Sequence, residues 1–376
     1  MKRTWILPLL WVVAAAHAAP FTLDTGPMVG KMLLTRTSDL CVVARNTADY
    51  LGKGAEYDPA AIHGGHAPAL EVDVRRVKAT LNFLCKTYTD DVRAGRPSRL
   101  QEAAFIERHF DRYRWHPDLD TARAYAAKSP KAKAQMLTGI PPDHLLMTKY
   151  YVKRLTGSMQ QDGTHPFALY ALPHDEAGMA LEEAETRKDS LTRFRYSKQD
   201  VLGGVLQRER LAEPLIWLSR GDLEDVLMQG TAVVETAAGV SYFNVHRNNG
   251  IAYDYTRPKE QQGRYWYFKR MPGIMGYGKD ADHKIEVRPR VTFAGDIDTL
   301  GLGKLLMVRY GDGATPINRL GILADKGGAF EGNLFQVDLL TDSYRGWSDY
   351  QAANRHLPNY VEAWLLLVKP DFEPAS

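Results

Sequence analysis

The sequence predicts an α+β protein that is mainly β, with an α-helical N-terminal part, a barrel-like domain and a smaller inserted β-rich domain. Towards the C-terminus, apolar residues alternate in short runs separated by glycine-rich turns, a pattern typical of short strands in a closed or nearly closed sheet. Before about residue 134, apolar residues recur at helical spacing instead. The chain has 376 residues, 44% of them hydrophobic, which is enough for two domains.

Residues 1–18 have the features of a secretory signal peptide. The basic pair Lys2-Arg3 precedes an apolar run over residues 5–16, and residues 16–18 supply small side chains at the cleavage positions. We therefore expect a mature chain from Ala19 that is exported, periplasmic or secreted. No cysteine lies near the cleavage site for a lipid anchor, and no later apolar run is long enough for a transmembrane segment.

Charge and motif content exclude several classes of function. The net charge of +3 is too small to indicate nucleic-acid binding, although it is compatible with an anionic polymer such as a cell wall. Neither a cluster with metal-ligand spacing nor a phosphate-cradling glycine loop occurs, so we expect no cofactor and no metal.

Residues 19–153 are predicted to form a mostly helical part that leads into the barrel. One helical face consists of Val74, Val77, Leu81 and Leu84, and a second of Phe105, Ile106, His109, Phe110 and Tyr113. Because His109 lies on an apolar stripe, we interpret it as a packed histidine rather than a catalytic one.

The chain contains two cysteines, Cys41 and Cys85. In an exported protein two cysteines of one domain are expected to form a disulfide. The alternative is a pair of buried thiols.

Residues 154–265 are expected to form the inserted domain. Ser197 and Ser219 each begin a sequence typical of a capped helix. The second helix leads to Gln229, and a hairpin is predicted over residues 231–245. Residues 266–376 then form the barrel domain.

Three aspartates in the barrel domain, Asp296, Asp325 and Asp338, each follow an alternating apolar run. Carboxylates at strand ends are held on rigid backbone, where a reacting group can be kept in position. Any single one could be an ordinary turn residue, but three on one small sheet system indicate a site.

These residues resemble the three-aspartate, double-psi β-barrel domain of the membrane-bound lytic murein transglycosylase A (MltA) family. Asp296 is followed seven residues later by a turn glycine, Gly303. Residues 325–332 read Asp-Lys-Gly-Gly-Ala-Phe-Glu-Gly, similar to the family's Asp-Thr-Gly-Gly-Ala-Ile-x-Gly. Val337-Asp338 corresponds to its final hydrophobic-Asp pair.

Further elements match the family in the same order, from about residue 102 to residue 369. Residues 146–153, Leu-Met-Thr-Lys-Tyr-Tyr-Val-Lys, resemble a Leu-Thr-Gly-Tyr-Tyr strand. Residues 229–232, Gln-Gly-Thr-Ala, resemble a Gln-Gly-Ser-Gly stretch, and residues 248–253 resemble Lys-Asn-Gly-x-x-Tyr.

The resemblance implies a lytic transglycosylase that cleaves peptidoglycan glycan strands and leaves 1,6-anhydromuramoyl ends. Asp338 aligns with the catalytic acid and base, Asp325 would orient it, and Asp296 would have a structural or substrate-side role. The substrate-binding residues would be Thr148, Tyr150, Tyr151, Gln229, Gly230, Thr231, Tyr253, Asp296, Gly327 and Gly328.

Two other functions remain open on the sequence. A relative that binds glycan without cutting it is suggested by the departures from the family pattern, which are Lys149, Val152, Lys153, Ala232 and Lys326. Lys326 in particular could pair with Asp325 and lower its pKa, the wrong direction for an acid. An expansin-like wall protein is the third interpretation, since that family shares the barrel type.

Overall fold

The structure is a computed structural model that describes residues 20–33, 36–67, 72–311, 315–327, 330 and 332–372. The predicted signal peptide with its cleavage site before Ala19, and the predicted site residue Gly328, lie outside the described residues. Within the described part of the chain, no helix is both long and apolar enough to cross a membrane.

The helices of the described residues are α1 (Thr37–Leu51), α2 (Val74–Arg93), α3 (Ala103–His109), α4 (Leu119–Ala126), α5 (Lys131–Thr138), α6 (Leu181–Thr186), α7 (Thr192–Arg195), α8 (Lys198–Leu202), α9 (Val205–Arg208), α10 (Arg220–Gln229), α11 (Ile297–Leu300) and α12 (Trp347–Asn354). The strands are β1 (Phe21–Leu23), β2 (Lys31–Met32), β3 (Phe110–Trp115), β4 (Leu145–Thr156), β5 (Phe167–Tyr170), β6 (Pro214–Leu218), β7 (Thr231–Thr236), β8 (Gly239–Asn248), β9 (Trp266–Met271), β10 (Thr292–Gly295), β11 (Leu305–Tyr310), β12 (Ile317–Lys326), β13 (Gln336–Tyr344) and β14 (Tyr360–Val368). The predicted α+β class, mostly sheet with several helices, is confirmed.

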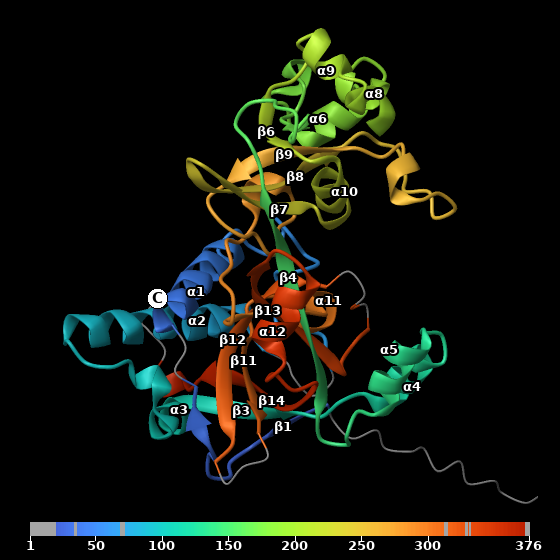
Figure 1. Ribbon diagram of the computed structural model, residues 1–376. Coiled ribbons are helices and arrows are strands. Elements are labelled where there is room, and N and C mark those ends of the chain that lie inside the picture. Colours follow the sequence, from blue (N-terminus) through green and yellow to red (C-terminus); the bar gives the residue numbers. More distant parts are fainter. Residues whose placement is uncertain are drawn as a thin grey trace, which may run out of the picture.

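A ring of hydrogen-bonded strands forms the lower part of the molecule in Figure 1. Its order is β14-β11-β12-β10-β13-β4, and β4 pairs back to β14 between Leu146 and Tyr360. This pairing closes the ring, so that these strands protect one another's edges. Their inward apolar side chains belong to one large buried cluster.

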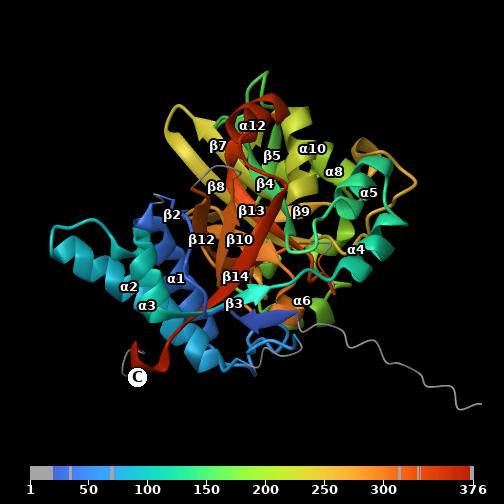
Figure 2. The same cartoon turned by 90° about the horizontal axis from the view of Figure 1, so that it is seen from below.

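Helices α1 and α2 pack against one side of the ring, while α4 and α5 lie on the other side (Figure 2). Val77, Leu81 and Leu84 of α2 are buried in the same cluster as the ring, as their helical spacing predicts. A disulfide between Cys41 and Cys85 joins α1 to α2.

The second predicted apolar face is only partly helical. Helix α3 ends at His109, and residues from Phe110 to Trp115 form β3 between β1 and β14. The helical prediction for Phe110 and Tyr113 is therefore wrong. A hydrogen-bonding partner more than two hundred residues away, β14, outweighs the local spacing, because strand formation depends strongly on its context.

A second hydrophobic cluster has all its buried members between Leu155 and Phe268. It belongs to the upper unit in Figure 1, which β4 enters from the ring as one continuous strand. The last residues of β4, Arg154–Thr156, pair with β7. Ser197 and Ser219 cap α8 and α10 as predicted, and β7 and β8 form the predicted hairpin.

Replacing both cysteines by serine should lower the free energy of unfolding. The disulfide spans 44 residues of sequence, and closing a loop of that length stabilises the native state by about 4 kcal/mol in the chain-entropy estimate. Urea unfolding of the double variant measures the loss. Reductant should reproduce the effect in the wild type and have none on the variant. Equal unfolding midpoints for the two proteins would contradict the prediction.

Candidate functional site

A cavity of about 510 Å³ lies between the ring and the upper unit. The ring and its connecting segments supply Tyr150, Tyr151, Val152, Ile274, Met275, Gly276, Lys284, Ala294, Asp325, Lys326, Gly327 and Asp338. The upper unit supplies Gln229, Gly230, Thr231, Asn244, Val245 and Trp266. We call this space the aspartate cavity.

The register of four neighbouring strands aligns the central residues of this cavity. Ala294 of β10 is opposite Asp325 of β12 on one side and opposite Asp338 of β13 on the other. Asp338 is in turn opposite Thr148 of β4. Because adjacent strands lie about 4.8 Å apart, the two aspartate backbones are separated by roughly 10 Å. The small side chain of Ala294 leaves the space between them open.

Asp338 has the properties of an acid that is protonated near neutral pH. Its partial burial at the cavity wall raises its pKa to about 7. The Thr148 hydroxyl and the Lys149 ammonium oppose this shift, while the Asp325 carboxylate adds to it. Its Oδ1 is buried and has no hydrogen-bond partner among the described residues. The fold therefore leaves this oxygen without a partner of its own.

The carboxylate of Asp325, unlike that of Asp338, has a hydrogen-bond donor on each of its oxygens. Its Oδ2 accepts a hydrogen bond of 2.8 Å from the Tyr150 hydroxyl, and its Oδ1 accepts one of 2.9 Å from the backbone N–H of Lys326. Burial raises its pKa to about 6, against the lowering effect of these donors and of Lys284. Asp325 and Tyr150 thus form a fixed polar pair beside Asp338.

The lysines that depart from the family pattern do not ion-pair with the two aspartates. Lys326 forms its ion pair with Asp298. Lys149 donates to the Pro358 and Met147 carbonyls and, at 2.7 Å, to Asn359 Oδ1. The sequence left open whether Lys326 forms an ion pair with Asp325 and lowers its pKa. This ion pair does not form, because Lys326 pairs with Asp298 instead.

The third lysine, Lys153, connects the ring to helix α10. It contacts Asp225 and Asp222 of that helix, and its backbone N–H donates to Gln229 Oε1 at 3.3 Å. Of the remaining departures, Val152 lines the aspartate cavity, and Ala232 is buried in β7 opposite Phe243.

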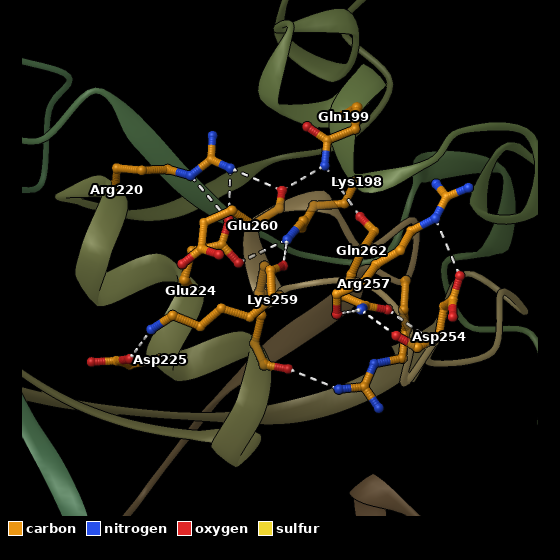
Figure 3. A network of polar contacts seen from close by, with 12 residues as sticks. Lys198, Gln199, Arg220, Glu224, Asp225, Asp254, Arg257, Lys259, Glu260 and Gln262 are labelled. Carbon is orange, nitrogen blue, oxygen red and sulfur yellow. Dashed lines mark hydrogen bonds and ion pairs between the residues drawn. The ribbon is translucent and has the colours of Figure 1, made fainter.

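Helix α10 carries Gln229 to the cavity, and a network of ion pairs fixes the helix (Figure 3). Glu224 accepts from the buried Lys198 at 2.7 Å and from Arg220 at 2.8 Å, while Asp225 accepts from Lys259 at 2.9 Å. Charged groups buried in this way are stable only when they are paired.

Glycine is required at two positions of the cavity wall. Gly230 ends α10 with φ of 78°, and a Cβ there would lie 3.1 Å from the Trp266 ring. At Gly327 a Cβ would lie within 2 Å of the Phe330 ring, at 1.7 and 1.9 Å from two of its carbons. Both positions therefore accept only glycine without rearrangement.

An aromatic stack extends from the aspartate cavity to the surface. Tyr151 lines the cavity and stacks on Tyr350, with ring centroids 4.8 Å apart. Tyr350 stacks in turn on Trp347 at 5.0 Å, and Trp347 is 63% exposed. Flat apolar rings with polar edges are suited to binding the faces of sugar rings.

Three predicted site residues do not line the cavity. Asp296 is fully buried and caps α11, where it accepts hydrogen bonds from Thr299 and from the backbone of Asn333. Of the two roles that the sequence left open for Asp296, this geometry supports the structural one, because its oxygens are occupied by the fold. Thr148 lies behind the wall and accepts a 2.7 Å hydrogen bond from Gln336.

Tyr253 is also outside the wall. Its ring is covered by the Arg264 guanidinium at 4.9 Å, and the same guanidinium lies 4.3 Å from the centre of the Trp266 ring. Tyr253 thus supports the wall through Arg264 rather than forming it.

Several lining residues were missed by the sequence analysis. Trp266 begins the range that was predicted as the barrel domain, where no role was assigned to it, and Asn244 belongs to a stretch that was interpreted only as a hairpin. Lys284 lies in a segment without a motif, yet it lowers the pKa of Asp325. Asn244 is opposite Thr231 of the predicted substrate-binding stretch, and Trp266 is opposite Asn248 on the next strand, so amide and aromatic side chains on these strands were the signal that could have identified the first two.

Asp338→Asn should become more stable relative to the wild type as pH rises from about 4 to about 7. In this window the native wild type binds more protons than the unfolded chain, so its free energy of unfolding falls with rising pH. Because asparagine does not ionise, the variant does not lose this part of its free energy of unfolding as pH rises. Melting temperatures of both proteins at pH 4 and pH 8 measure the difference.

The control is Asp349→Asn, which removes an exposed carboxylate of α12 outside the cavity. It should show no such gain. The raised pKa of Asp338 would be contradicted if the melting temperature of Asp338→Asn relative to the wild type stayed constant or fell between pH 4 and pH 8.

Comparison with solved structures identifies the fold. No family model matches the sequence, and no curated protein gives a significant match. MltA from Neisseria gonorrhoeae has a TM-score of 0.53 at 15% identity over 94% of both chains. E. coli MltA with bound chitohexaose has a TM-score of 0.51 at 16% identity over 94% of this chain and 96% of that one. A membrane-bound lytic murein transglycosylase from Agrobacterium tumefaciens has 0.51 at 15% identity over 89% and 93%. The protein therefore has the fold of the MltA lytic murein transglycosylases, as its motifs predicted.

Proposed function

We propose that the protein is a peptidoglycan lytic transglycosylase that breaks the β-1,4 bond between N-acetylmuramic acid and N-acetylglucosamine without using water. One observation carries the proposal. Asp338, with a pKa of about 7 and a buried, unpaired Oδ1, lines a cavity in a fold that is shared with the MltA enzymes.

In the proposed reaction Asp338 acts twice. Its carboxyl group first donates a proton to the bridging oxygen, and the bond between that oxygen and C1 of the muramic acid breaks. The 6-hydroxyl of the same sugar then bonds to C1 and gives its proton to the Asp338 carboxylate. The products are a 1,6-anhydro end and a free glucosamine 4-hydroxyl, and the acid is regenerated. Intramolecular attack benefits from a high effective concentration of the hydroxyl.

The pKa of Asp338 suits this double role. A group with a pKa near the working pH is protonated in part of the molecules and also accepts a proton readily as the carboxylate. Asp325 supports Asp338 by keeping its pKa high through charge repulsion. Tyr150 holds Asp325 in place for this purpose.

The rest of the aspartate cavity supports a glycan as ligand. Gln229, Thr231 and Asn244 offer amide and hydroxyl groups for sugar hydroxyls, and Trp266 offers a ring face. The E. coli MltA structure contains chitohexaose, a β-1,4-linked chain of N-acetylglucosamine, which is one of the two sugars of the proposed substrate. We propose that strands of peptidoglycan occupy this cavity and continue over the aromatic stack.

The finer domain assignments accompany this proposal. We propose that the six-strand ring is a double-psi β-barrel and that residues 154–265 are an insertion into it. An exported protein with residues 1–18 as signal peptide would reach the peptidoglycan that it acts on.

Asp338→Asn should abolish release of anhydromuropeptides from purified sacculi. Loss of a general acid typically lowers rates by a factor of about 10²–10⁴. Mass spectrometry of the soluble products measures the loss, and Asp349→Asn serves as the control with a carboxylate removed elsewhere.

The same experiment separates the enzyme from a glycan-binding relative. A wild type that binds sacculi and releases no anhydro products would be such a relative. Turnover by Asp338→Asn at the wild-type rate would remove Asp338 from the mechanism.

Asp325→Asn should move the alkaline limb of the pH–rate profile to lower pH. Activity requires protonated Asp338, so it falls as pH rises through the pKa of about 7. Removing the Asp325 charge takes away a contribution that raises this pKa. kcat/KM on sacculi from pH 5 to pH 9 measures the limb for both proteins. An unmoved limb, or a shift to higher pH, would exclude this coupling.

A further inference from the structure

A second cavity, of about 710 Å³, lies next to the aspartate cavity. Ile274 is in the wall of both, and the chain from Pro272 to Gly276 passes from one wall to the other. The remaining lining residues are Leu33, Arg36, Asp39, Arg154, Tyr242, Val287, Arg288, Pro289, Arg290, Val291, Arg319, Asp342, Ser343 and His356. We call it the arginine cavity.

Positive charge dominates the arginine cavity. Five arginines line it, against two aspartates, Asp39 and Asp342. Neither aspartate forms an ion pair with these arginines within the described residues. Arg154 and Arg288 are paired instead with glutamates outside the lining, Glu235 and Glu286.

Arg319 is the strongest indication of a missing partner. Its side chain is buried, with 4% of the residue exposed, and its Nε has no hydrogen-bond partner among the described residues. The guanidinium donates to the Arg290 carbonyl and to the Tyr310 hydroxyl, both at 3.0 Å, and no carboxylate pairs with it in the described part of the chain. A buried charge without a counter-charge is costly, which points to an anion that comes from outside the chain.

Other groups of the cavity are consistent with a positive field. Burial and the charges of Arg290 and Arg319 lower the pKa of His356. Arg290 has φ of 69°, a left-handed conformation that is strained for a residue with a side chain. Strain of this kind persists where the surrounding structure holds it, and it is concentrated at ligand sites.

We propose that the arginine cavity binds the carboxylates of a peptide stem attached to the glycan strand in the aspartate cavity. This inference rests on the proposed function. The glycan backbone of peptidoglycan bears no charge, whereas its peptide stems carry free carboxylates. Guanidinium groups bind carboxylates through paired hydrogen bonds. An extended stem of four residues spans about 13 Å, so a stem can extend from one cavity into the adjoining one.

Arg290→Gly tests the proposal without straining the backbone, and besides the charge it removes one hydrogen bond, of 3.2 Å, from the Arg290 guanidinium to the Tyr344 hydroxyl. The variant removes a guanidinium, and glycine accepts the left-handed backbone. Arg210→Gly is the matched control, because Arg210 also has a positive φ, of 53°, and lies outside both cavities. Both variants therefore lose one positive charge and one strained side chain.

The first measurement is calorimetric titration of the mature chain with soluble stem peptides cleaved from sacculi by an amidase. We expect binding that weakens with rising salt, a loss of about tenfold in Arg290→Gly, and wild-type affinity in Arg210→Gly. Absent binding, equal losses in both variants, or inorganic phosphate binding as tightly as the stem would each overturn the proposal.

The second measurement compares turnover of stem-bearing strands with that of strands stripped of their stems. For Arg290→Gly the KM on stem-bearing strands should rise relative to that on stripped strands, whereas Arg210→Gly should keep the wild-type ratio. An unchanged ratio in Arg290→Gly would overturn stem binding. A wild type that cuts neither substrate would refute the proposed function, and the titration would still decide whether stems bind.

Discussion

The candidate site depends on the pairing of β10 with its two neighbours. Because β12 and β13 both meet β10 at Ala294, Asp325 and Asp338 lie on either side of one small residue. A slip of one residue in either pairing would turn the corresponding carboxylate to the other face of the sheet. The pairing of β10 with β12 itself shifts by one residue between Phe293 and Ala294, and this shift brings Asp325 opposite Ala294. Closure of the ring between β4 and β14 gives each of its strands a partner on both sides. The pairing register of β10, β12 and β13 thus determines where the two carboxyl groups lie.

The same cavity gives the two carboxyl groups different properties. Both lose water, and burial raises both pKa values. Asp325 is compensated by the Tyr150 hydroxyl and the Lys326 backbone, which favour its ionised form. Asp338 has a buried oxygen without a hydrogen-bond partner and the higher pKa, about 7 against about 6 for Asp325. Pairs of carboxyl groups whose environments separate their pKa values are a common basis for dividing the roles of acid and supporting charge.

Site residues and helix ends could be predicted from the sequence where they depend on a local pattern or on a contiguous motif. Asp338, Asp325 and Gln229 belong to such motifs, and the caps of α8 and α10 follow from short spacings. The strand Phe110–Trp115 could not be predicted in this way, since its partner β14 is distant in sequence. For Asp296 the sequence left a structural and a substrate-side role open. Its spacing to Thr299 is that of a helix cap, a local signal that favours the structural role.

The arginine cavity escaped the sequence analysis because charge was judged over the whole chain. A net charge of +3 is modest, but it does not reveal that five arginines from separate segments meet at one cavity. Arg36 precedes α1, Arg154 is on β4, and Arg319 is on β12. They converge because the ring brings β4 and β12 near the start of α1, a consequence of topology rather than of composition. The chain from Pro272 to Gly276 then borders both cavities. A ligand with a neutral backbone and anionic branches matches this division of charge, because only its branches need the arginines.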